Sequence, residues 1–265
     1  MFKKIGSNNL DEVINMNIII SNEIDIFALD ITRRHNKSGL SSHEKLSFDI
    51  LNRNNLIQTV FDDKHFGGVI ITKDKLKIPI INTAQPRVYQ YFVAWHEIYH
   101  LFYDEEQMDY NHNINIDLNY NERKADYFAA CMMLGNIYEY FFSIEDENFI
   151  DKIIKCMNAY KAPYKAVLIQ LYQDSKIKYN NIKLQKSILE HFDLDLNLIE
   201  EFERLELDVE LVKPSYVINF GGLDKIIERQ IEENPDETYH KDNLVFLKKL
   251  REKAQKIKEE ITNDN

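Results

Sequence analysis

The sequence has few of the residues that break secondary structure or cross-link a chain. Among 265 residues there are 7 glycines, 5 prolines and 2 cysteines. So little glycine and proline excludes a collagen-like chain and a chain made mostly of linkers. The two cysteines, Cys131 and Cys156, form neither a disulfide framework nor a metal-ligand spacing. We therefore expect two buried thiols in a reducing compartment.

Long apolar runs and an excess of positive charge are also missing. No stretch approaches the roughly 20 apolar residues of a membrane-spanning helix, and no apolar segment follows the N-terminal lysines as in a signal peptide. The 33 Lys and Arg residues face 44 Asp and Glu residues, a net charge of -11. Because phosphate binding needs surplus positive charge, no direct nucleic-acid partner is expected. We expect a cytoplasmic protein without a membrane partner, and the abundance of Asn, Ile, Lys and Tyr favours an AT-rich bacterial genome or its mobile elements.

What the chain does have is enough apolar residues for a core, 44% of the total, mostly in a helical pattern. Only Val69–Thr72 and Leu76–Asn82 have the pattern of strands, in a β-hairpin, and Pro79 predicts an edge position or a bulge for the second. Helices are predicted over Ser21–Asn36, from Ser41, and over Arg87–Tyr103, Tyr120–Leu134, Phe149–Tyr160, Ala162–Gln173, Leu184–Phe192, Leu198–Leu205 and Lys241–Ile261.

One short motif, His96-Glu97-Ile98-Tyr99-His100, carries the strongest chemical signal. Histidines at this spacing lie about 40° apart on one helix face, so both imidazoles can reach one ion. Zinc binds neutral imidazole, and a catalytic zinc site keeps a position open for water. Glu97 is about 100° round the helix from His96. It is expected to take a proton from that water as the catalytic base and to deliver it to the leaving amine.

A catalytic zinc site needs a third protein ligand, and Glu122 in the downstream helix can supply it. Asp126, one turn further on, can accept the free N–H of a ligating imidazole and fix its tautomer. The alternative is that both carboxylates only solvate an acidic helix. Metzincin spacing is absent after His100. Competing third ligands in the intervening polar loop are Glu105, Glu106, His112 and Asp117.

The run IPIINTAQPRVYQYFVAWHEIYHLFYD, followed by NERKADYFAACMML, resembles the ImmA/IrrE-type metallopeptidases. In that family a strand precedes a Pro-started helix with HExxH, and an E-x-x-A-[ND]-x-F-A helix follows. The resemblance covers Gly67–Leu134. It implies a zinc cofactor held by His96, His100 and Glu122, with Glu97 as the catalytic residue. It also implies a protein substrate, a bacterial helix-turn-helix repressor that is cut to release stress or mobile-element genes.

The resemblance extends loosely to Lys161–Tyr172, which is similar to a helix-turn-helix-like element of the family. Tyr99 departs from the family, which usually has a small residue there, and Met133-Leu134-Gly135 replaces an apolar pair plus proline. A ring at position 99 either narrows the cleft or packs on the core. The expected fold is α+β, mainly α. A zincin-like metallopeptidase domain with a small β-sheet spans residues 1–140, and a helical C-terminal region spans 141–265, with the helix-turn-helix-like element near 149–173.

Other features carry weaker signals. The strand Leu76–Asn82 either binds an extended substrate by β-augmentation or is an ordinary hairpin strand packed on the site helix. The terminal helix is expected to dock on its own domain rather than to dimerise. A basic face, better explained as solvated surface than as a DNA contact, comprises Lys161, Lys165, Lys176 and Lys178. Candidates for the hydroxyl that binds the oxyanion are Tyr89, Tyr99, Tyr103 and Tyr127.

The leading functional hypothesis is a hydrolase, a zinc metalloprotease of the gluzincin-like HExxH…E kind that acts on a repressor. Two alternatives stay open. A catalytically silent zinc-binding regulator would use the same fold to bind a partner, but a pure binder does not need Glu97. A toxin-like effector protease would act on a host or competitor protein, but the sequence shows no export signal.

Overall fold

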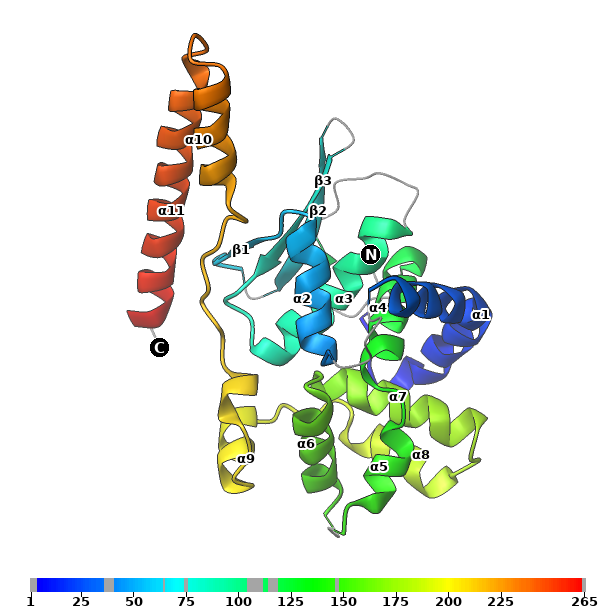
Figure 1. The fold of residues 1–265 in the computed structure, drawn as a ribbon. Helices are drawn as coiled ribbons and strands as arrows, with labels where there is room; N and C mark the ends of the chain where they lie inside the picture. Colours follow the sequence, from blue (N-terminus) through cyan, green and yellow to red (C-terminus); the bar gives the residue numbers. More distant parts are fainter. Residues whose placement is uncertain are drawn as a thin grey trace.

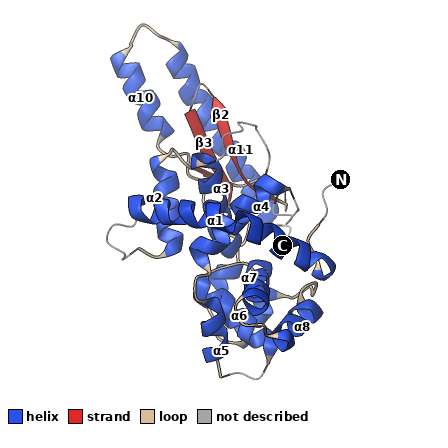
Figure 2. Cartoon of the chain, turned by 90° about the vertical axis from the view of Figure 1, so that its right-hand side faces the viewer, coloured by secondary structure: helices blue, strands red, loops and turns tan. Residues whose placement is uncertain are grey.

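Helices make up most of the molecule, and one small sheet packs among them (Figure 1). Figure 2 shows how little of the chain is in strands. The expected α+β, mainly α class is therefore confirmed. The computed structural model describes residues 4–35, 41–63, 65–73, 76–103, 112–113, 119–145 and 148–263.

Most helices lie where helical spacing predicted them. The first begins at Leu10, well before the expected Ser21, because Val13 and Ile14 continue its buried stripe. The helices are α1 (Leu10–His35), α2 (His43–Arg53), α3 (Arg87–Phe102), α4 (Tyr120–Met133), α5 (Ile137–Ser143), α6 (Phe149–Tyr160), α7 (Tyr164–Ile177), α8 (Ile182–His191), α9 (Leu198–Arg204), α10 (Leu223–Glu233) and α11 (Tyr239–Asn263). Of these, α5 and α10 were not predicted.

The sheet has the strand order β1-β3-β2-β4. Its strands are β1 (Ile57–Thr59), β2 (Phe66–Lys73), β3 (Leu76–Asn82) and β4 (His112–Asn113). The predicted hairpin is confirmed as the antiparallel pair β2 and β3. The expectation that β3 is an edge strand is wrong over Ile80–Asn82, where β1 pairs with it in parallel. Pro79 lies just beyond the reach of β1, so its missing N–H interrupts no hydrogen bond with that strand.

The helix α3 carries the HExxH motif and lies at the centre of the fold. A polar turn leads into it, because the buried side chain of Asn82 accepts hydrogen bonds from the backbone of Phe61 and Ala84. Pro86 then occupies the N-cap, where no backbone N–H is needed. One face of α3 packs on β2 and β3 and another on α4, where Trp95 meets Phe128 edge-on. Eleven of its 16 residues are buried, so packing fixes its position on most sides.

Tyr99, the bulky departure from the family pattern, packs on the core. Its ring lies 6.1 Å from that of Phe27 and 6.0 Å from that of Phe128, and only 3% of the residue is exposed. A ring in this position fills space between α3, α1 and α4. Of the two interpretations of this ring, a narrowed cleft or packing on the core, the placement supports packing on the core.

The helices after residue 140 share a core with those before it. One cluster of buried apolar side chains runs from Ile5 to Val212, and the boundary expected after residue 140 falls within α5. Ten of the 14 residues of α7 are buried, including its polar Gln173. The segment expected to be helix-turn-helix-like, near residues 149–173, forms the helices α6 and α7, and α7 is a core helix.

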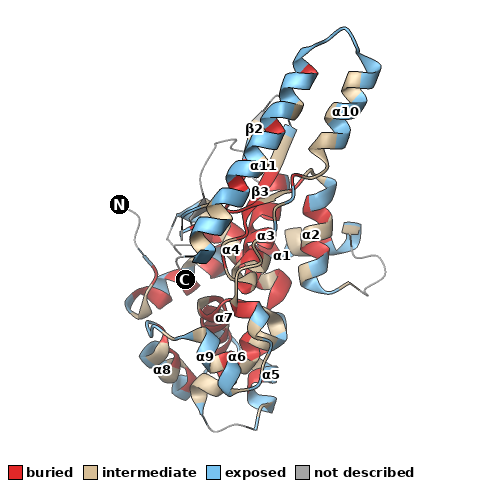
Figure 3. Ribbon diagram, turned by 90° about the vertical axis from the view of Figure 1, so that its left-hand side faces the viewer, coloured by how far each residue is buried: buried red, intermediate tan, exposed pale blue. Residues whose placement is uncertain are grey.

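The last two helices form an antiparallel hairpin that projects beyond the rest of the molecule (Figure 1). The helix α10 has no buried residue, and α11 has only His240, Leu247 and Ala254 (Figure 3). Of the docking expected for the terminal helix, the structure shows contacts with the segment before α10: Lys258 Nζ donates to the Tyr216 carbonyl, and the Arg251 guanidinium lies 5.7 Å from the centre of the Phe220 ring. Across the described residues, no helix combines the length and apolar character needed to cross a membrane.

Candidate metal centre

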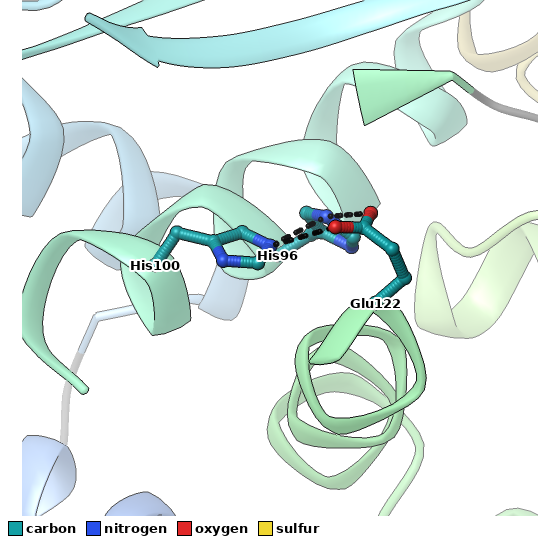
Figure 4. A group of neighbouring side chains, drawn as sticks. All are labelled: His96, His100 and Glu122. Carbon is teal, nitrogen blue, oxygen red and sulfur yellow. Dashed lines mark hydrogen bonds and ion pairs between the residues drawn. The ribbon is translucent and has the colours of Figure 1, made fainter. Parts of the chain in front are cut away.

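Two histidines of α3 and one glutamate of α4 converge on a single point (Figure 4). His96 Nε2 lies 3.1 Å from His100 Nε2 and 3.3 Å from Glu122 Oε2. His100 Nε2 lies 3.7 Å from Glu122 Oε1. In a tetrahedral zinc site with bonds of about 2.0–2.1 Å, two ligand atoms are about 3.3 Å apart. The spacing and the donor types, two imidazole nitrogens and a carboxylate oxygen, therefore fit zinc.

Local structure explains how Glu122 reaches the histidines. Asn119 caps α4 by accepting a hydrogen bond from the Asn121 backbone, which places Glu122 in the first helical turn. The helix dipole favours a negative charge in that turn. The Glu122 side chain is 21% exposed, whereas the two histidines are nearly buried. The glutamate therefore forms the side of the cluster closer to solvent.

Asp126 holds His96 from behind, as expected. Its Oδ1 lies 2.9 Å from His96 Nδ1, which leaves Nε2 directed at the cluster. Burial of His96 acts to lower its pKa, but the hydrogen bonds and negative charges of Asp126 and Glu122 outweigh burial and hold the pKa well above its usual value. A metal ion must therefore displace a proton from this ring to bind.

Glu97 lies on a different side of α3, against the sheet. Its side chain is fully buried, and Gly68 of β2 leaves the space that its carboxylate fills. A Cβ atom on Gly68 would lie 2.8 Å from Glu97 Oε1 and 2.9 Å from the Ile80 carbonyl oxygen. Within the described residues, the group that could hold a metal ion consists of His96, His100 and Glu122 and does not include Glu97.

Most of the competing ligands fall outside the described residues. These are Glu105, Glu106 and Asp117. The fourth, His112, has a described backbone that pairs with Gly68, and its side chain is outside the description.

Two of the four candidate oxyanion tyrosines have hydroxyl partners away from the three clustered ligands, and the ring of a third, Tyr99, lies 5.5 Å from the ring of His100. The Tyr103 hydroxyl donates to Asp30, and the Tyr127 hydroxyl accepts a hydrogen bond from Gln173. Tyr99 lies in the aromatic core, and the hydroxyl of Tyr89 is so deeply buried that desolvation raises its pKa. None of these contacts joins a tyrosine hydroxyl to the three clustered ligands.

The four lysines of the helix-turn-helix-like element are each paired with a carboxylate. Lys161 pairs with Glu44, and Lys165 lies 3.6 Å from Asp193. The other two pairs are Lys176 with Asp11 at 2.6 Å and Lys178 with Asp174 at 2.8 Å. The positive charges of the four lysines are therefore balanced locally by carboxylates.

Sequence reasoning missed several residues that support the centre. Gly68 belongs to a Gly-Gly pair before a strand, a signal of close backbone approach. Arg123, three residues before Asp126, donates to that carboxylate at 3.0 Å. Lys77 donates to the carbonyls of His100 and Leu101 and so holds the end of α3, although nothing in its sequence context indicates this.

Comparison with known proteins adds no relative. No family model matches the chain, and neither a curated protein nor a solved structure matches it. The resemblance to the ImmA/IrrE-type metallopeptidases therefore rests on the sequence motifs alone.

Proposed function

We propose that this protein is a zinc-dependent endopeptidase of the ImmA/IrrE type. The observation that carries the proposal is the convergence of His96, His100 and Glu122 on one point, with Glu97 on the same helix. Two imidazoles and a carboxylate form the ligand set of many catalytic zinc sites, whereas structural zinc sites usually have four protein ligands. When bound, zinc would polarise the scissile carbonyl and lower the pKa of water.

The protein's own residues would prepare the site for this chemistry. Asp126 would keep His96 in the tautomer whose Nε2 faces the cluster. Glu97, held against Gly68 in a buried position, would take a proton from the attacking water and pass it to the leaving amine. Exclusion of bulk water around Glu97 would strengthen its interactions with the reacting groups.

For the substrate, we propose a helix-turn-helix repressor in the cytoplasm of a bacterium, cleaved to release stress or mobile-element genes. The net charge of -11 and the paired lysines of α6 and α7 favour a protein that acts on a DNA-binding partner over one that binds DNA itself. A peptidase also needs an extended segment in its site, so cleavage should fall in a linker or a loosened helix end of the repressor.

The test combines zinc analysis with cleavage of candidate repressors. The purified protein should bind about one zinc per chain. Glu97→Gln should keep zinc and fold while cleavage falls by about 100- to 10,000-fold, since the general base is lost. Glu228→Gln, the same change on an exposed helix, is the control and should cleave normally.

Mass spectrometry of the products locates the cut. Zinc-loaded protein that cleaves none of the candidate repressors would favour the silent regulator. Unchanged turnover by Glu97→Gln would remove the general-base role.

A further inference from the structure

The carboxylate that orients His96 is itself held by a buried arginine. Asp126 divides its two oxygens between His96 Nδ1, 2.9 Å from Oδ1, and Arg123 Nη1, 3.0 Å from Oδ2. Arg123 is only 3% exposed. A buried guanidinium is tolerated when it is paired and hydrogen-bonded. The pair with Asp126 meets this need, so the two side chains fix one another next to the metal centre.

The contacts of Arg123 continue into the N-terminal helix. Its Nη2 donates to Asn17 Oδ1 of α1 at 3.0 Å, and Asn17 Nδ2 donates to Gln173 Oε1 of α7 at 2.8 Å. Gln173 Nε2 in turn donates to the Tyr127 hydroxyl of α4 at 3.1 Å. Both amide residues are almost fully buried. A series of hydrogen bonds therefore runs from the metal ligand through α4 and α1 to α7 and returns to α4.

The direction of these bonds leaves each amide only one useful orientation. A guanidinium has donors and no acceptor, so Asn17 must present its oxygen to Arg123 and its NH₂ group to Gln173. Gln173 must then present its own oxygen to Asn17 and its NH₂ group to Tyr127. A flip of Asn17 would lose both of its hydrogen bonds, and a flip of Gln173 would lose its bond to Asn17, in a buried place where lost bonds are costly.

We propose that Arg123 is a positioning residue for the metal centre, and that Asn17 and Gln173 hold it in place. Through this relay the packing of α1 and α7 sets the orientation of Asp126 and hence of His96. The inference rests on the proposed metal site, and it extends the functional unit to α7, beyond the boundary expected after residue 140. Removal of the Asn17 contact should therefore weaken zinc binding, although Asn17 touches no metal ligand.

The experiment measures zinc affinity by competition with a chelator, using Zn²⁺ alone and the full chain. Residues that orient metal ligands typically change affinity about 10- to 100-fold. We expect a loss of this size for Arg123→Met and a smaller loss for Asn17→Ala. Arg123→Lys keeps the positive charge but loses the planar guanidinium that donates to two partners at once. Its zinc affinity should lie between that of the wild type and that of Arg123→Met. Arg204→Met removes an exposed arginine that also contacts two carboxylates, Asp151 and Glu201, and should leave zinc affinity unchanged.

A double-variant cycle separates positioning from general stability. If the relay acts through Asp126, then Asn17→Ala should have no further effect on zinc affinity in an Asp126→Ala protein. The proposal would be overturned if Asn17→Ala lowered zinc affinity equally in the wild-type and the Asp126→Ala proteins. It would also be overturned if Arg123→Met and Asn17→Ala both left zinc affinity unchanged. Should Arg123→Met fail to fold, Asn17→Ala and the cycle still decide the question.

The outcome is also separable from that of the proposed function. Wild-type protein that binds no zinc would overturn both. Coupled zinc affinities in a protein that cleaves no repressor would support the relay while contradicting the peptidase. A lower melting temperature of metal-free Asn17→Ala with unchanged zinc affinity would show a purely structural role and overturn the relay.

Discussion

The helix α4 and the α10–α11 hairpin are both rich in charged residues, but they use the charge differently. In α4, Arg123 is 3% exposed and Asp126 is partly buried; the two contact each other, and Asp126 also contacts His96. In the hairpin, Arg229 is 64% exposed and lies 4.0 Å from Glu233, in a pair open to water. Burying charge costs free energy that exposed pairs do not incur. The buried charges of α4 lie beside the candidate metal centre, whereas the charges of the hairpin lie in water.

Thiol reactivity should show the largest difference between the two regions. Burial raises the pKa of Cys131 to about 12 and that of Cys156 to about 12. At pH 8 the reactive thiolate would then be about 1,000-fold rarer than in an exposed cysteine with a pKa of about 8.5. A cysteine placed in the hairpin by Val245→Cys, at a position 54% exposed, should react with iodoacetamide at the ordinary rate.

Rates are compared by mass spectrometry of the folded variant, with the urea-unfolded protein as the control. The reaction of the two native thiols with iodoacetamide should become faster as the pH rises toward 12, because the thiolate fraction grows. Equal rates for all three cysteines in the folded protein would contradict the difference in burial.

Glu122→Ala should give the next largest effect, a loss of zinc affinity above about 100-fold, because a metal ligand matters more than the groups that orient it. Glu233→Ala is the matched change in the hairpin and should leave zinc affinity unchanged. Metal analysis and chelator competition measure both. Full zinc affinity in the Glu122→Ala protein would show that Glu122 is not the third ligand, and Asp117 and His112 would be the next candidates.

Gly68→Ala tests whether β2 leaves the space that the carboxylate of Glu97, the proposed general base, occupies. The new Cβ would lie 2.8 Å from Glu97 Oε1 and 2.9 Å from the backbone oxygen of Ile80, which the strand pairing holds in place. We expect a loss of about 1–3 kcal/mol in the free energy of unfolding, as for overpacked cores, and lower peptidase activity with zinc retained.

Gly135→Ala is the control, because nothing lies within 4 Å of the position of its Cβ. It should keep full activity and stability. Normal activity of the Gly68→Ala protein would show that Glu97 has room to move.

The smallest effect should come from the ion pair between Arg251 and Asp224, which are 3.0 Å apart and 41% and 38% exposed. Exposed pairs contribute about 0–1 kcal/mol. Arg251→Ala should therefore change the free energy of unfolding, measured in urea, by less than about 1 kcal/mol, and zinc affinity not at all. A clear loss of zinc affinity would mean that the hairpin communicates with the metal centre.

The sequence predicted the parts of the site that depend on local geometry. His96 and His100 share a helix face by spacing alone, and the same holds for Glu122 and Asp126 one turn apart. Convergence of the two helices was expected only through the chemistry of zinc and the family resemblance. The structure then adds the contacts of Asp126 with His96 and Arg123.

Contacts between distant residues could not be predicted. Asn17 and Arg123 are 106 positions apart in the sequence, and no local pattern predicts that they form a hydrogen bond. The interior position of β3 depends on β1, a strand of only 3 residues that pairs in parallel, so its period is too short to recognise. The helix α10 was missed although its apolar residues, Leu223, Ile226, Ile227 and Ile231, are spaced as on one face of a helix.

The bond between Asn17 and Gln173 joins residues 156 positions apart. Contacts of such separation form late, because the intervening chain must first be brought together. During synthesis all three zinc ligands leave the ribosome before Gln173 does. We expect a nascent chain that ends before α7 to hold zinc weakly, so the proposed metal centre would be complete only after the chain has been made and folded through α7.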